Sequence, residues 1–240
     1  MVADQCIFKR YELKYLLNPE QKAAVLAAIA PYMSLDQYGR STVRNLYFDT
    51  KDYRLIRRSM DKPLYKEKLR IRSYRRIEPH GKVFAELKKK YKGVVYKRRL
   101  ALDEEQAMGW LCGKLPGPED SQIAREIRYF CSFYGHLQPT VFLSYERCAY
   151  YCNDGSDFRV TFDENILCRR EGLSLREDVW GTPILPEGMT LMEIKSNGAI
   201  PLYLVRILTE HRIYKTSFSK YGKAYEMLIF PQQKGDALYA

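Results

Sequence analysis

The chain has few of the residues from which common metal and redox centres are built. Its 240 residues include three histidines, His80, His136 and His211, which lie far apart in the sequence. Its six cysteines form no C-x-x-C pair. A structural zinc site needs Cys and His ligands clustered at short spacings. The sequence therefore predicts no zinc centre and favours cysteines that are reduced and mostly buried.

Several standard catalytic and targeting motifs are also missing. The sequence has no G-x-x-x-x-G-K-[ST] and no G-x-G-x-x-G, so it gives no support to a P-loop or a Rossmann nucleotide site. It has no H-E-x-x-H and no G-x-S-x-G. The longest apolar stretch, Ala23 to Met33, is too short to span a bilayer and contains Pro31. The first residues have no apolar signal-peptide core, so we expect a cytoplasmic protein without a membrane span.

The chain instead has an excess of positive charge and of tyrosine. It carries 40 Lys and Arg against 29 Asp and Glu, a formal net charge of +11, and it contains 20 tyrosines. Such an excess of positive charge implies an anionic partner, which can be phosphate, nucleic acid or an anionic membrane surface. Tyrosine suits strands and polar interiors, because its ring packs while its hydroxyl forms hydrogen bonds.

Four short stretches place charged residues at every second position. They are Glu12-Leu-Lys14, Arg70-Ile-Arg72, Glu86-Leu-Lys88 and Glu193-Ile-Lys195. Residues i and i+2 of a β-strand point to the same face. Each stretch therefore directs two charges to one face and a bulky apolar side chain to the other. This pattern predicts a sheet with a charged, enclosed face, whose apolar face packs against a surrounding layer.

The same alternation extends this charged face along six strands. The rows that share a face are Lys68, Arg70, Arg72 and Tyr74; Phe84, Glu86, Lys88 and Lys90; Val95, Lys97 and Arg99; Tyr145 and Arg147; Arg159, Thr161 and Asp163; and Glu193 and Lys195. Alternation directs Glu146 and Arg98 outward. If the rows converge, they enclose about eight to ten cations, which need solvent or a bound polyanion because burying like charges is costly. Taken singly, each row also fits a solvated strand face or a charged sheet edge.

The order of predicted elements indicates one α+β domain. Strands are expected at Phe8–Leu17, Thr42–Phe48, Leu64–Arg75, Lys82–Tyr91, Val94–Leu100, Thr140–Tyr151, Phe158–Phe162, Asn165–Arg170 and Thr190–Lys195. Helices are expected from Asn18 to Pro31, and at Tyr53–Arg58 (capped by Asp49), Asp103–Cys112, Glu119–Phe133, Leu202–His211 and Ser219–Leu228. No linker argues for two domains, so we expect a single domain over residues 1–240 with a flexible tail from about residue 231. A closed barrel would let the charged faces meet inside.

The charged rows and their flanking residues resemble a known family. The matching segments are Arg10-Tyr-Glu-Leu-Lys-Tyr15, Asn45-Leu-Tyr-Phe-Asp49, Lys68-Leu-Arg-Ile-Arg-Ser-Tyr74, Phe84-Ala-Glu-Leu-Lys88, Ser144-Tyr-Glu-Arg147, Arg159-Val-Thr-Phe-Asp163, Met192-Glu-Ile-Lys195 and Phe218-Ser-Lys-Tyr221. In this order they resemble the polyphosphate polymerase domain of the vacuolar transporter chaperone (VTC) family in its stand-alone bacterial form. That domain belongs to the CYTH, or triphosphate tunnel metalloenzyme, superfamily.

The resemblance implies an antiparallel eight-stranded closed β-barrel, a tunnel, with helices packed outside. It also implies a metal-dependent phosphotransferase that moves the γ-phosphate of ATP onto a growing polyphosphate chain, with Mn²⁺ or Mg²⁺ as cofactor. By motif, the phosphate-gripping residues would be Lys14, Arg70, Arg72, Lys88, Arg147, Arg159 and Lys220. Further substrate contacts are assigned to Lys97, Arg99, Lys195, Lys215 and Tyr145, and the metal is assigned to Glu193, with Glu12 and Glu86 as additional candidates.

The chain departs from the family pattern at two positions, the first of which weakens the hypothesis of a hydrolase with several N-terminal metal-binding carboxylates, and other functions stay open independently of these departures. Arg10 occupies the place of the first acidic residue in the superfamily's E-x-E-x-K, and Ser217 stands where a second basic residue is expected near Phe-Ser-Lys. The alternatives are a triphosphatase on the same fold and a non-catalytic polyphosphate-binding module. Nucleic-acid binding is the fourth hypothesis, but no recognition motif supports a specific nucleic acid. The expected partners are ATP and polyphosphate, and translocation across a membrane would require a separate membrane partner protein.

Overall fold

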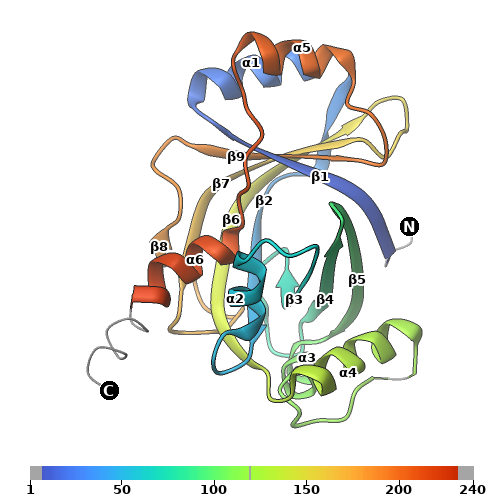
Figure 1. The fold of residues 1–240 in the computed structure, drawn as a ribbon, viewed down its shortest axis with the longest axis vertical. Coiled ribbons are helices and arrows are strands. Elements are labelled where there is room, and N and C mark those ends of the chain that lie inside the picture. Colours follow the sequence, from blue (N-terminus) through green and yellow to red (C-terminus); the bar gives the residue numbers. More distant parts are fainter. Residues whose placement is uncertain (1–6, 119, 232–240) are drawn as a thin grey trace.

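In the described part of the chain, nine antiparallel strands form one sheet that closes on itself (Figure 1). The computed structural model describes residues 7–118 and 120–231. The strands are β1 (Ile7–Leu17), β2 (Met33–Asp49), β3 (Tyr65–Ser73), β4 (Lys82–Tyr91), β5 (Val94–Asp103), β6 (Gln138–Cys152), β7 (Arg159–Arg169), β8 (Thr182–Pro183) and β9 (Thr190–Ser196). They follow the order β6-β2-β3-β4-β5-β1-β9-β7-β8, and pairing of β6 with β7 completes a ring of eight strands. The predicted closed barrel is confirmed.

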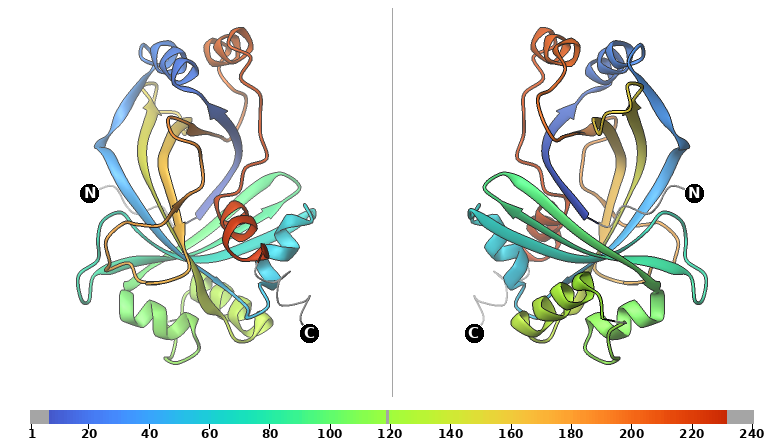
Figure 2. Two further views of the ribbon diagram at one scale, coloured as in Figure 1. Left: turned by 90° about the vertical axis from the view of Figure 1, so that its left-hand side faces the viewer. Right: turned by 90° about the vertical axis from the view of Figure 1, so that its right-hand side faces the viewer.

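Six helices in the described part of the chain pack around this barrel. They are α1 (Pro19–Ile29), α2 (Arg54–Met60), α3 (Glu104–Leu111), α4 (Gln122–Tyr134), α5 (Leu202–Glu210) and α6 (Lys220–Leu228). Figure 2 shows α1 and α5 together at one end of the molecule, and α3 and α4 at the other. None of the helices in residues 7–118 and 120–231 combines the length and the apolarity that crossing a membrane requires.

The outer face of the barrel is the apolar one, as the alternating pattern predicted. Ile71 and Leu87 are fully buried in a cluster that includes Trp110 of α3 and Phe130 of α4. Ile194 belongs to a second cluster, beneath α1 and α5. Burying such side chains stabilises the fold by roughly 1.5–3 kcal/mol each. The charged side chains between them consequently point to the inside of the ring.

Side-chain caps fix where the helices begin. The side chain of Asn18 accepts a hydrogen bond from the backbone N–H of Gln21, and the Gln21 side chain accepts one from the Asn18 N–H, a reciprocal capping box. The buried Asp49 carboxylate accepts from the N–H groups of Leu55 and Ile56, at 2.8 and 3.0 Å, and so caps α2 as predicted.

Several predicted boundaries differ from the structure. β2 begins at Met33 rather than Thr42, because the polar segment before Thr42 still pairs with β6 across an irregularity in register between Leu35 and Arg40. The two short strands predicted around Asn165 are one strand, β7, within which Asn165 adopts a left-handed backbone with φ 47°. Asn tolerates this conformation better than most residues.

Two further predictions concern residues at the edges of the described chain. Helix α4 starts at Gln122, after Ser121, whose hydroxyl caps it by accepting from Ala124 N–H, whereas Glu119 was the predicted start. Residue 119 itself lies outside the described residues. Most of the predicted flexible tail, residues 232–240, lies outside them too, so that expectation stays a prediction.

Candidate functional site

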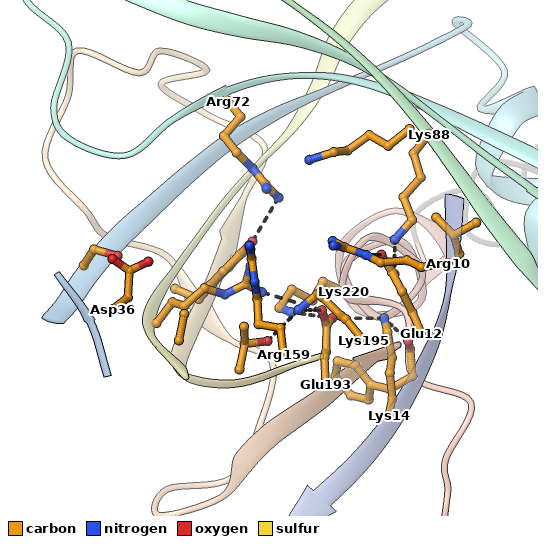
Figure 3. Close-up of a pocket in the computed structure, with 18 of the residues that line it drawn as sticks. Arg10, Glu12, Lys14, Asp36, Arg72, Lys88, Arg159, Glu193, Lys195 and Lys220 are labelled. Atoms are coloured by element: carbon orange, nitrogen blue, oxygen red, sulfur yellow. Dashed lines mark hydrogen bonds and ion pairs between the residues drawn. The ribbon is translucent and has the colours of Figure 1, made fainter. Parts of the chain in front are cut away.

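The barrel encloses a cavity of about 1420 Å³ whose wall is strongly basic (Figure 3). Fifteen described Lys and Arg residues line it: Arg10, Lys14, Lys66, Lys68, Arg70, Arg72, Lys88, Lys90, Lys97, Arg99, Arg147, Arg159, Lys195, Lys215 and Lys220. The carboxylates among the described lining residues are those of Glu12, Asp36 and Glu193. These fifteen basic residues are more than the eight to ten cations expected from the sequence.

All but one of the residues singled out from the sequence line this cavity. The set comprises Lys14, Arg70, Arg72, Lys88, Lys97, Arg99, Tyr145, Arg147, Arg159, Lys195, Lys215 and Lys220, together with the carboxylates of Glu12 and Glu193. Glu86 is the exception, because it is fully buried within the wall, behind the residues that face the cavity. The two residues expected outside are indeed outside: Glu146 pairs with Arg40, and Arg98 pairs with Glu126 of α4.

Glu193 is held among four cations. Its Oε1 lies 3.4 Å from the ammonium groups of both Lys14 and Lys220, and its Oε2 lies 3.1 Å from Lys195 and 3.6 Å from Arg147. Burial raises the pKa of Glu193, but these four charges outweigh burial and hold that pKa well below its usual range. Glu193 is therefore a carboxylate at any physiological pH.

Asp163 is a buried carboxylate that orients two of these cations. Arg147 donates to it through two nitrogens, at 2.6 and 2.7 Å, and Lys220 donates at 2.5 Å. The paired bonds from Arg147 have the bidentate geometry that fixes a guanidinium in place. Asp163 was not chosen as a site residue from the sequence, although it shares a strand face with Arg159. Alternation alone cannot tell a residue that faces the cavity from one that supports its wall.

Glu86 supports a second group of cations in the same way. Arg70 donates to it at 2.9 and 2.7 Å, while Arg72 lies at 3.7 Å and Lys97 at 3.4 Å. The guanidinium of Arg70 also donates to the hydroxyl of Tyr47, at 2.8 Å. Burial raises the pKa of Glu86, but Arg72, Lys97 and Arg70 more than offset it and keep the carboxyl ionised. Glu86 thus acts as an internal counter-ion for this group.

A third part of the wall contains lysines with no carboxylate partner. Lys66, Lys68, Lys90 and Lys215 line the cavity, and none of them forms an ion pair with the described carboxylates. Lys68 donates to the hydroxyl of Ser219 at 2.7 Å. Burial, followed by the neighbouring charges of Lys14, Lys88, Lys66 and Arg70, lowers the pKa of Lys68 well below its usual value. This part of the wall lacks negative charge, which a bound anion would supply.

Four basic residues that line the cavity, Lys66, Lys68, Lys90 and Arg10, were not assigned to the site from the sequence. Lys66 was in none of the rows, and Lys68 and Lys90 appeared in the rows without being assigned a role. Arg10, which lies 3.8 Å from Glu12, was treated only as a departure from the family motif. Its position two residues before Glu12 and four before Lys14 was the available signal, because all three share one face of β1.

Two lysines in the cavity have pKa values near neutrality. Burial lowers the pKa of Lys195 to about 7, against the opposing effect of Glu193, and lowers the pKa of Lys97 to about 7, against Glu86. Lys195 donates to the hydroxyl of Thr161 at 2.7 Å. Glu12 behaves differently. Burial and the charge of Glu193 raise its pKa, but Lys88 and Lys195 outweigh them and lower the pKa to about 2.

Glu193 and Glu12 have the chemistry to take part in a divalent-metal site. Mg²⁺ and Mn²⁺ prefer oxygen ligands, and in phosphate-handling sites one or two carboxylates share the ion with substrate phosphates and water. Both carboxylates line the cavity, and the charge of Glu193 acts directly on Glu12. Glu86 fits less well, because the wall encloses it completely. Residues 7–118 and 120–231 contain no group of three or more metal-binding side chains, so phosphate oxygens would have to complete the ligand set.

Comparison with known proteins agrees with this architecture. A family model described as the VTC domain matches residues 9–229. No curated protein matches the chain. Among solved structures, a Bacillus halodurans protein with a suggested adenylate cyclase activity is 15% identical to this chain, with a TM-score of 0.56. The match covers 90% of this chain and 96% of that protein.

A second solved structure has the same fold. It is a Hippeastrum protein, first suggested to be an adenylyl cyclase and described as having a dominant triphosphatase activity. It is 18% identical, with a TM-score of 0.51, and the match covers 90% of this chain and 95% of that one. At such low identity these two structures show the fold alone, whereas the family model spans nearly the whole chain. The chain belongs to the VTC domain family and has the triphosphate tunnel fold.

Proposed function

We propose that this protein is an ATP-dependent polyphosphate polymerase, which transfers the γ-phosphate of ATP to a growing polyphosphate chain inside the barrel. The observation that carries the proposal is the composition of the cavity wall, where fifteen cations face three carboxylates. Like charges at this density need counter-ions. A chain of phosphates supplies about one negative charge per unit along its whole length.

The chemistry requires positioning more than a covalent catalyst. A terminal oxygen of the acceptor chain attacks the γ-phosphorus, and the bond from that phosphorus to the bridging oxygen of ADP breaks. The attacking oxygen is already anionic, so no general base is needed. Arg147 and Lys220 are held by Asp163, and Arg70 and Arg72 by Glu86. Such pre-oriented donors stabilise the charge that spreads over the transferred phosphoryl oxygens.

Glu193, with Glu12 beside it, would hold the divalent metal. Bound there, Mn²⁺ or Mg²⁺ would neutralise charge on the phosphates and help to orient them. The remaining phosphates would be contacted by Lys14, Lys88, Arg159, Lys97, Arg99, Lys195, Lys215 and Tyr145. The match of the VTC family model to residues 9–229 supports the proposed activity.

The direct test is incubation of the purified chain with ATP and Mn²⁺. We expect ADP and long phosphate chains to appear together, and both to be lost in Glu193→Gln and Arg72→Ala. Glu146→Gln is the matched control for Glu193, because Glu146 is a strand carboxylate outside the barrel that pairs with Arg40. Robust synthesis by Glu193→Gln would contradict the metal assignment.

A triphosphatase is the second candidate, and the triphosphatase activity of the Hippeastrum protein with this fold favours it. Here water replaces the acceptor phosphate. The same time course separates the two, since a hydrolase releases free orthophosphate without polymer. A chain that binds polyphosphate tightly but produces neither product would instead be the non-catalytic binding module.

A further inference from the structure

One part of the cavity wall combines arginines with aromatic rings. The guanidinium carbon of Arg159 lies 3.9 Å from the centre of the Tyr151 ring, and that of Arg99 lies 4.4 Å from the Phe84 ring. Arg72 lies 5.9 Å from the Tyr74 ring, which in turn packs edge-on against Phe84. The aromatic rings thus orient the arginines by cation–π contacts. Arg72 is held further by donating to the Asn45 side-chain oxygen at 2.9 Å and to the Tyr145 hydroxyl at 3.1 Å.

Two tyrosines of this region present their rings to the cavity and to solvent. Tyr74 is 42% exposed and Tyr38 is 74% exposed, and both line the cavity. Tyr38 follows Asp36, whose carboxylate accepts a hydrogen bond from the Tyr38 backbone N–H at 3.0 Å. Figure 3 places Asp36 on the same side of the cavity as Arg72 and Arg159. Accessible aromatic faces and phosphate-binding groups therefore lie at one end of the same site.

The lysine part of the wall lacks such rings. Lys68 and its neighbours Lys66, Lys90 and Lys215 are accompanied by Tyr47 and Tyr221, whose rings stack on each other and are only 6% and 1% exposed. Those rings have no free face. A ligand that is only phosphate suits this part, whereas a ligand with both phosphate and a planar ring suits the Tyr38–Tyr74 part.

We propose that Tyr38 and Tyr74 form a nucleobase-binding rim, which stacks on the base of a nucleoside triphosphate while Arg72 and Arg159 receive its phosphates. This inference rests on the proposed function and names the part of the site that distinguishes a nucleotide from inorganic triphosphate. Stacking on a tyrosine face is tolerant of base identity, because every base has a π-face. The rim therefore favours nucleotides over inorganic triphosphate without selecting strongly between adenine and guanine.

The test compares the binding of ATP and of inorganic tripolyphosphate by calorimetry, with the full chain and its variants. For Tyr74→Ala and Tyr38→Ala we expect ATP affinity to fall about tenfold, the loss of one base–aromatic contact, and tripolyphosphate affinity to change less than twofold. Tyr74→Phe keeps the ring and should keep ATP affinity. Tyr91→Ala is the matched control, because Tyr91 is 47% exposed but does not line the cavity.

The possible failures are distinguishable. Equal losses for both ligands, or no loss for ATP, would overturn the nucleobase rim while leaving the proposed polymerase intact. A wild-type chain that binds tripolyphosphate but not ATP would also overturn it and would favour a different phosphate donor. Binding of neither ligand would overturn both this inference and the proposed function.

Discussion

The inner and outer faces of the same strands use identical residue types for opposite purposes. On the outside, Lys89 and Arg98 share Glu126 of α4, at 3.3 Å each, and Lys22 of α1 pairs with Glu164 at 2.5 Å. These pairs join helices to the barrel, with two carboxylates for three cations. On the inside, Lys88 and Arg99, the immediate neighbours of Lys89 and Arg98, belong to a wall in which cations far outnumber carboxylates.

Stability does not account for the excess of positive charge on the inner face. Stability alone would favour outer-type pairing, because unbalanced like charges within a barrel repel one another. The inner carboxylates Asp163 and Glu86 orient arginines and lysines but are too few to neutralise them. An anionic ligand, as proposed above, would supply the missing negative charge. The following predictions test the contrast between the two faces.

The largest difference should appear in activity. Arg72→Ala should lower kcat/KM for ATP by roughly 10²–10³-fold, because it removes a pre-oriented donor to the phosphates. Arg98→Ala, on the outer face of β5, should change kcat/KM less than twofold. Steady-state assays of ADP release measure both, and comparable losses in the two variants would remove the functional distinction between the faces.

The second difference should appear in stability. Asp163→Asn should lower the free energy of unfolding by about 3 kcal/mol, since it removes the buried carboxylate to which Arg147 and Lys220 donate and leaves them only the more distant Glu193. Glu126→Gln should cost about 1 kcal/mol or less, because its ion pairs are partly solvent-exposed. Urea denaturation of both variants gives the comparison. An equal loss of unfolding free energy would mean that water screens the ion pairs of Asp163 as well as those of Glu126.

The third difference is a dependence on pH. With pKa values of about 7, Lys195 and Lys97 lose their protons as pH rises from 6 to 9, so tripolyphosphate affinity should fall about tenfold. The stability of the ligand-free chain should change in the opposite direction. Between pH 7 and the usual lysine value of 10.5, the unfolded chain binds more protons than the folded one, so the free energy of unfolding rises with pH.

Calorimetry and denaturation across this pH range measure the two trends. The double variant Lys97→Met/Lys195→Met should weaken both trends, whereas Lys89→Met should change neither, because Lys89 lies outside the barrel. A tripolyphosphate affinity that is constant from pH 6 to 9 would show that these lysines keep their protons when ligand-free.

The smallest effect concerns the outer face alone. Lys22→Met should change the free energy of unfolding by less than about 1 kcal/mol and leave tripolyphosphate affinity unaltered, because the pair with Glu164 is partly exposed. Thermal denaturation and calorimetry test this. A marked loss of affinity would show that the position of α1 influences the cavity.

Much of the fold could be predicted because alternation in a strand is a local property. Leu13, Ile71, Leu87 and Ile194 each stand between two charges, and each packs on the helix-covered side. Caps such as Asn18 and Asp49 are also local, since their hydrogen bonds reach residues only three to seven positions along the chain. Boundaries failed where pairing with a distant strand overrode weak local preference, as in the polar start of β2 and at Asn165.

The sequence by itself determined which side chains share a strand face, and with that the separation of Lys88 from Lys89 and of Arg99 from Arg98. Only the tertiary structure decided which of the inward residues reach the cavity and which support its wall. Glu86 and Asp163 look like Glu193 in the sequence, yet they are enclosed by arginines and lysines from neighbouring strands. That outcome depends on strand register and on the closure of β6 onto β7, which bring together residues far apart in the chain.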